Sequence, residues 1–100
     1  MNNIFNLPPL PVPEELTEIL VSTGNVRVER IVSAGQTSGW YDQSETEFVL
    51  LLQGRAELEF EGGGTVTLGK GDYLTIPAHK KHRVGYTSAD PACVWVCVFF

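Results

Sequence analysis

The residues best suited to chemistry lie in two short segments of the sequence, 41–47 and 79–82. The first segment places a phenol, an amide and two carboxylates at alternate positions, in Tyr41, Gln43, Glu45 and Glu47. Alternate side chains of a β-strand point to the same face, so an extended segment would present all four together. Oxygen donors of this kind suit hard divalent metals. A polar strand end that faces solvent fits the same pattern, so the spacing leaves both interpretations open.

The second segment, PAHKKHRV, contains the only two histidines, His79 and His82. On a regular strand these two side chains would point to opposite faces. Histidine is also a common polar residue outside metal sites. The pair is therefore weak evidence for a metal site when it is taken alone.

Together, however, the two segments resemble the cupin family. The first cupin motif is a glycine, five residues, His-x-His, three or four residues, Glu, six residues and a glycine. Gly35, Glu47 and Gly54 fall at these spacings, with Tyr41 and Gln43 in the places of the two histidines.

The second cupin motif is a glycine, five residues, Pro-x-Gly, two residues, His, three residues and Asn. Gly71, Pro77 and His82 match it, while His79 replaces its last glycine and Tyr86 replaces its asparagine. The resemblance extends from about residue 26 to the end of the chain.

The resemblance implies a small β-barrel with a divalent metal at its mouth, either Fe, Mn, Zn or Ni. The family's usual ligands are two His and one Glu from the first motif and one His from the second. Carried over to this sequence, Glu47 and His82 are direct matches and Gln43 stands at a ligand position. His79 would supply a replacement nitrogen, and Tyr41 would either ligate the metal or act as a catalytic proton donor or acceptor.

Two classes of function follow from this pattern. In the first, a bound metal polarises an oxygen of a small polar metabolite, as in an oxygenase, isomerase or lyase. In the second, the chain is a metal-free module that binds or senses a small molecule, because one fold hosts many functions. Whether the protein is an enzyme stays open at this point.

The elements that would position these residues are short strands. Runs rich in Val, Leu, Ile, Thr and aromatic residues are separated by glycine-containing turns, at 26–33, 46–53, 55–61, 65–69, 72–78, 82–87 and 93–100. This pattern predicts an all-β fold, a small antiparallel β-barrel of the cupin or jelly-roll type. We expect residues 25–100 to form the barrel and residues 1–24 to pack on it.

The first 24 residues are expected to contain a Pro-rich arm and one short helix. Four prolines within residues 8–13 are incompatible with a helix there. Between Pro13 and Gly24 the acids come early, and the apolar residues Leu16, Ile19 and Leu20 follow helical spacing. These features predict a short helix that ends at Gly24.

Two of the predicted strands, FVLLL and CVWVCVFF, are apolar on both faces. Strands of this kind are covered on both sides. In a chain of 100 residues the second cover would come from the proline arm or from another subunit, and we expect a homodimer.

Composition limits the remaining possibilities. One hundred residues make one domain, and the formal net charge of −5, without a basic stripe, argues against a nucleic-acid partner. No apolar run approaches the ~20 residues that span a bilayer, and the first residues lack the charges of a targeting peptide. We therefore expect a cytoplasmic protein without a membrane partner.

Cys93 and Cys97 are too far apart on one strand to pair, and both are expected to be buried thiols.

Overall fold

The computed structural model describes all 100 residues, and every regular element in it is a β-strand. The strands are β1 (Leu16–Thr23), β2 (Val26–Ser33), β3 (Glu47–Gln53), β4 (Ala56–Phe60), β5 (Gly64–Leu68), β6 (Tyr73–Ile76), β7 (His82–Thr87) and β8 (Cys93–Phe99). All strand pairs are antiparallel. The predicted all-β class is confirmed.

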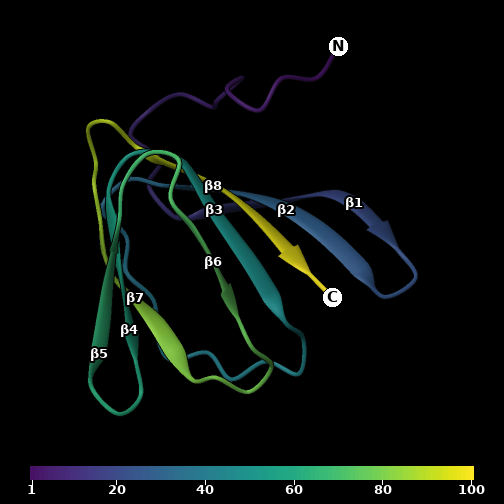
Figure 1. The fold of residues 1–100 in the computed structure, drawn as a ribbon. Helices are drawn as coiled ribbons and strands as arrows, with labels where there is room; N and C mark the ends of the chain where they lie inside the picture. The colour runs from purple at the N-terminus through teal and green to yellow at the C-terminus, as the bar shows by residue number, and fades with distance from the viewer.

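The strands form two sheets that face one another (Figure 1). The larger sheet has the order β1-β2-β8-β3-β6 and the smaller one the order β5-β4-β7. Leu51, Leu58 and Trp95 belong to the hydrophobic core between them. Hydrogen bonding does not close the two sheets into a continuous barrel, because β6 ends the larger sheet and β7 pairs only with β4 among the strands. The structure therefore confirms the antiparallel sheets of the prediction, which face one another, but it does not show a closed barrel.

The predicted helix between Pro13 and Gly24 is wrong, because this segment forms strand β1. Leu16 lies opposite Val32, and the pairing with β2 continues to Thr23 opposite Val26. The segment is rich in β-branched residues, which lose side-chain freedom in a helix and fit a pleated sheet. A helix here would have no core against which to pack its apolar residues. The edge of β2, by contrast, offers backbone hydrogen-bonding groups to a strand.

The residues before β1 contain no helix or strand, and they contact the larger sheet through backbone carbonyl groups. The Arg30 guanidinium donates hydrogen bonds to the carbonyl oxygens of Ile4 and Asn6, at 3.0 Å and 2.9 Å. Gln36 donates to the carbonyl oxygen of Val12 at 2.9 Å, and the Val12 side chain is buried. The division of the chain at residue 24 stays a prediction, although β1 is part of the larger sheet.

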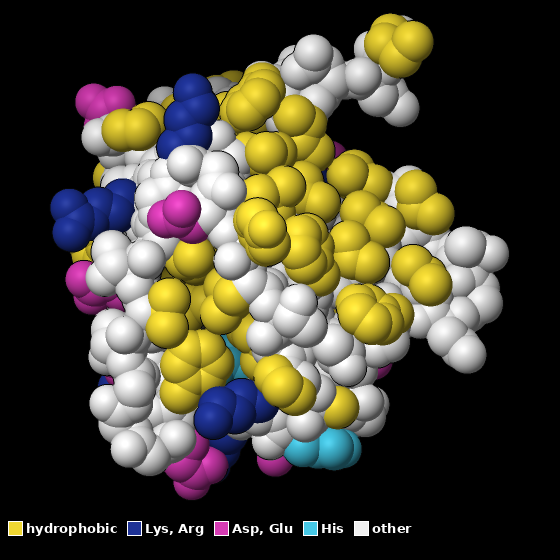
Figure 2. All heavy atoms as spheres, in the orientation of Figure 1, with side chains coloured by type: hydrophobic (Ala, Val, Ile, Leu, Met, Phe, Trp, Pro, Cys, Tyr) yellow, Lys and Arg dark blue, Asp and Glu magenta, His cyan; other side chains and the backbone are white.

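Strands β3 and β8 are apolar on both faces, as their sequences predicted. Toward the smaller sheet, Val49 lies beside Cys97 and Leu51 beside Trp95. On the opposite face, Phe48 lies beside Val98 and Leu50 beside Val96. Figure 2 shows hydrophobic side chains gathered over this part of the surface.

Two further sequence predictions can be compared with the structure. Cys93 and Cys97 are unpaired and buried, as expected. The chain has no helix that could cross a membrane.

Candidate functional site

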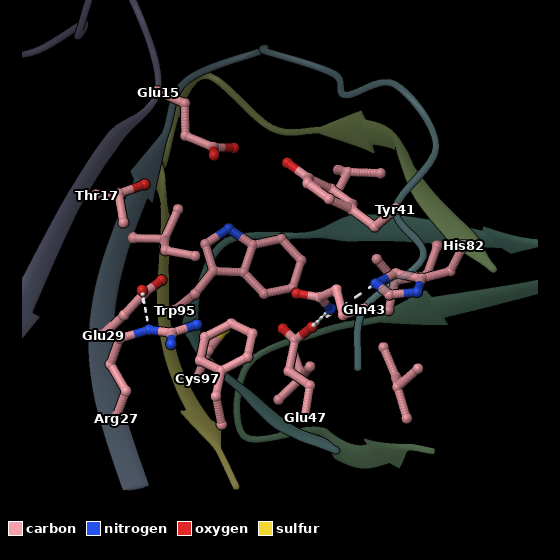
Figure 3. Close-up of a pocket in the computed structure, with 16 residues that line it drawn as sticks. Glu15, Thr17, Arg27, Glu29, Tyr41, Gln43, Glu47, His82, Trp95 and Cys97 are labelled. Carbon is pink, nitrogen blue, oxygen red and sulfur yellow. Dashed lines mark hydrogen bonds and ion pairs between the residues drawn. The ribbon is translucent and has the colours of Figure 1, made fainter. Parts of the chain in front are cut away.

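A cavity of about 260 Å³ lies between the two sheets (Figure 3). Its walls are mostly apolar and include Val49 and Trp95 from the larger sheet and Leu58 from the smaller one. The polar side chains that line it are Glu15, Thr17, Arg27, Glu29, Gln43, Glu47 and His82. A few polar groups in a largely apolar concave surface are typical of a small-molecule site.

Glu47 is the most buried carboxylate of the cavity, with a residue exposure of 8%. It is the first residue of β3, and its position in the strand directs it toward the smaller sheet. The Gln43 amide donates a hydrogen bond to its Oε1 at 2.9 Å, and the same oxygen lies 3.7 Å from Nε2 of His82. A buried carboxylate needs such partners, because desolvation strongly disfavours an isolated charge.

His82 faces Glu47 from the first position of β7 and is 4% exposed. Its Nδ1 donates a hydrogen bond to the Lys80 carbonyl oxygen at 2.8 Å, which leaves Nε2 directed into the cavity. Burial lowers the pKa of His82, but the Glu47 carboxylate and the Lys80 carbonyl outweigh it, so the pKa is raised above its usual value. The pair can therefore present either a proton donor or an acceptor close to neutral pH.

Tyr41 and Gln43 come from the segment between β2 and β3, which lies against the start of β7. The Tyr41 N–H donates to the His82 carbonyl oxygen at 2.7 Å, and the His82 N–H donates back at 3.1 Å. The Tyr41 and His82 rings lie 5.6 Å apart between centroids. Burial, followed by the charge of Glu15, raises the pKa of Tyr41, so the phenol keeps its proton at neutral pH.

The structure brings four of the five predicted site residues together, and His79 is the exception. Its side chain is 69% exposed, and Nδ1 pairs with the Asp42 carboxylate at 2.9 Å. The His79 backbone has a φ of 62°, in the left-handed region, and it does not line the cavity. His79 lies in the turn before β7, and its side chain is directed away from Glu47 and His82.

The residues present do not make up a complete metal centre. No three His, Cys, Asp or Glu side chains are placed to hold one ion. Cys97 lines the cavity, and burial, followed by the Glu47 charge, raises the pKa of its thiol. Glu47 and His82 are two strong donors, one fewer than the three protein ligands of a typical catalytic zinc site.

Sequence reasoning missed several residues that line the cavity. Glu15 was assigned to a helix, so its approach to the site was not foreseen. Arg27 and Glu29 share parity with Ile31 on β2, and this alternation could have identified a polar inward face. Trp95 and Cys97 share parity on β8 in the same way.

Comparisons with known proteins agree with this architecture. The family model for the cupin domain matches residues 28–99. A protein of Ralstonia eutropha JMP134 named a "putative mannose-6-phosphate isomerase" is 35% identical, with a TM-score of 0.93, and the match covers 99% of this chain and 95% of that one. None of the curated proteins matches the chain.

Two more distant structures share the fold. A cupin superfamily protein of Desulfitobacterium hafniense DCB-2 is 20% identical, with a TM-score of 0.81, over 93% of this chain and 83% of that one. A cupin domain from Bordetella pertussis Tohama I is 23% identical, with a TM-score of 0.70, over 91% and 97%.

Two facing antiparallel sheets around a cavity define a small β-sandwich domain. The chain belongs to the cupin family.

Proposed function

We propose that the cavity binds a small organic molecule through Glu47 and His82, without requiring a divalent metal. The observation that carries this proposal is the buried carboxylate and imidazole, 3.7 Å apart, at the wall of a mostly apolar cavity. Such a pair recognises one polar group of a ligand, while the apolar walls accept its carbon skeleton.

His82, Glu47 and Tyr41 would have different roles toward the ligand. His82, held at Nδ1 by the Lys80 carbonyl, offers Nε2 to the ligand, and Glu47 accepts a hydrogen bond or stabilises protonated His82. Tyr41 serves as a proton donor, since its phenol keeps its proton at neutral pH. This set can move a proton to or from a bound ligand, and catalysis by it would be general acid–base catalysis.

The divalent metal that the cupin motifs imply is the alternative. Glu47, His82 and Gln43 are the residues that would hold it, and a metal there would polarise an oxygen of the ligand. The position of His79, which is exposed and paired with Asp42, favours the metal-free interpretation.

The Ralstonia protein's name suggests a sugar phosphate as a second candidate ligand, on the strength of 35% identity. The cavity's one guanidinium, Arg27, is already paired with Glu29 and Glu45. Mannose 6-phosphate is accordingly one compound to include in a ligand screen, and we expect it to bind weakly.

The experiment is a thermal-shift screen of small metabolites in the presence of EDTA, followed by calorimetry of the hits. We expect at least one ligand to bind equally well with and without chelator. Glu47→Gln and His82→Gln should weaken its binding at least about tenfold, since each loses a buried polar contact. Glu61→Gln, at an exposed position outside the cavity, is the matched control. A ligand that binds only after addition of Fe, Mn, Ni or Zn would overturn the proposal.

A further inference from the structure

The charges around the cavity do not balance. Glu15, Glu29 and Glu47 bring three carboxylates to its lining, and Arg27 brings the only guanidinium. The lining therefore has more carboxylate than guanidinium groups. Its walls are otherwise mostly apolar, and an unpaired charge in such surroundings is energetically costly.

The guanidinium is already paired with two carboxylates. Arg27 donates from Nε to Glu29 at 2.7 Å and from its two terminal nitrogens to Glu45 at 3.0 Å and 3.1 Å. Its carbon Cζ also lies 4.3 Å from the centroid of the Phe99 ring. The bidentate pairing with Glu45 fixes the orientation of the guanidinium. An anionic ligand at this wall would therefore compete with Glu29 and Glu45 for a single positive charge.

Glu15 is the carboxylate without a cationic partner. Its one hydrogen bond comes from the Ser33 hydroxyl at 3.4 Å, and no ion pair includes it. Burial raises its pKa, the Ser33 hydrogen bond opposes this rise, and the charge of Glu29 adds to it. A positive group beside Glu15 would relieve both unfavourable effects.

Two aromatic side chains lie near this carboxylate. In Figure 3 the Trp95 indole lies between Glu15 and Glu47 with its nitrogen-bearing edge toward Glu15, and the Tyr41 hydroxyl points toward Glu15. Trp95 is 4% exposed, so its ring is held in a fixed position. The two side chains therefore border the space beside Glu15 and bring no positive charge to it.

At the far end of the cavity, Nε2 of the buried His82 ring makes no hydrogen bond, although Glu47 lies close to it. The structure gives the His82 ring one hydrogen bond, at Nδ1, and its Nε2 faces the cavity 3.7 Å from Glu47. This buried group is independent of Glu15, and it indicates a ligand with a hydrogen-bonding atom at the opposite end from its charge.

We propose that the cavity selects a small organic cation, an ammonium compound whose positive centre lies beside Glu15. A hydroxyl or similar group at its other end would reach His82 and Glu47. The cavity of about 260 Å³ is many times larger than the ~10–15 Å³ that a single water molecule needs. This inference rests on the proposed ligand pocket and adds the charge of the ligand.

Three probes of nearly equal shape test the charge directly. Choline is the cation, 3,3-dimethylbutan-1-ol is its neutral isostere, and 3,3-dimethylbutanoate is the anion. Calorimetry with EDTA present should show choline binding at least about tenfold more tightly than the alcohol, and the anion binding most weakly. Glu15→Gln should reduce the ratio of choline to alcohol affinity to near one. Glu14→Gln, on the exposed neighbouring residue, should leave the ratio unchanged.

Two results would overturn the inference. The first is that the alcohol or the carboxylate binds as tightly as choline, or that the ratio of choline to alcohol affinity is unchanged in Glu15→Gln. The other is the absence of choline binding at concentrations up to about 100 mM. In either case the proposed function still stands if a neutral or anionic ligand from the screen loses affinity in Glu47→Gln, so the two proposals fail separately.

Discussion

The two faces of the larger sheet differ from one another, and each departs in part from the usual arrangement. The face turned toward the smaller sheet carries Glu29 and Glu47 among its apolar residues. On the outer face, Phe48, Leu50 and Val98 are only partly buried and carry no charge. Antiparallel sheets commonly place apolar side chains inside and polar ones outside. Polar groups kept inside point to ligand recognition, and an apolar exterior points to a further contact.

The outer face does carry one ion pair, between Arg30 and Glu18, and the residues before β1 bury its arginine but leave Glu18 partly exposed. Arg30 contacts Glu18 and is 8% exposed, with its remaining donors on the carbonyls of Ile4 and Asn6. Tyr73 at the other side of the same face is 67% exposed. The N-terminal segment thus satisfies the charged part of the outer face, while β3 and β6 keep apolar side chains open to a partner.

The sharpest comparison of the two faces uses adjacent leucines of β3. Leu51 is fully buried between the sheets, and Leu50 is partly buried on the outer face. Leu51→Ala should cost about 2–5 kcal/mol of unfolding free energy, because it opens a cavity in the core. Leu50→Ala should cost about 1 kcal/mol. Urea unfolding at low protein concentration measures both, and equal costs would mean that the outer face is covered within one chain.

The outer face is also the expected surface for a second copy of the chain. The homodimer predicted from the sequence stays a prediction, and light scattering should give about 22 kDa, twice the 11.0 kDa of one chain. Leu50→Lys should shift the mass to that of the monomer, because it places a charge on an apolar contact. Thr65→Lys, at an exposed position of β5, is the control. A monomeric mass for the wild type at 100 µM would contradict the predicted homodimer.

On the inner face, Glu15 should make stability depend on pH. Its folded pKa is raised by burial, so the folded chain binds this proton more tightly than the unfolded chain does. Stability is then lost as the pH rises from the ordinary value of 4.5 through the raised pKa. Glu15→Gln removes this loss, and its melting temperature should exceed that of the wild type more at pH 7 than at pH 4. The same difference at both pH values would contradict this assignment.

The smallest effect is expected at His79. Its ring is exposed and paired only with Asp42, so His79→Asn should change the unfolding free energy by less than about 0.5 kcal/mol. Asparagine is chosen because it tolerates the left-handed backbone found there. Ligand affinity should stay unchanged, in contrast to His82→Gln. A loss of affinity in His79→Asn would mean that this residue reaches the cavity in solution.

The sequence predicted those parts of the fold and site that depend on local periodicity. Alternation and glycine-containing turns located seven of the eight strands, and the cupin spacings identified Glu47 and His82. Strand β1 was missed because its apolar spacing also fits a helix, and only the free edge of β2 decides between them. His79 was grouped with the site because spacing says nothing about the direction of a side chain in a turn. Glu15 could not be placed until β1 was known.

The central claim is that Glu47 and His82 form an organic ligand site that works without a metal. Elemental analysis of protein purified without a metal-affinity column tests it most directly. We predict Fe, Mn, Ni and Zn contents well below one per chain, and equal contents in the wild type and in the Glu47→Gln and His82→Gln variants. One metal ion per wild-type chain, lost in both variants, would contradict the claim.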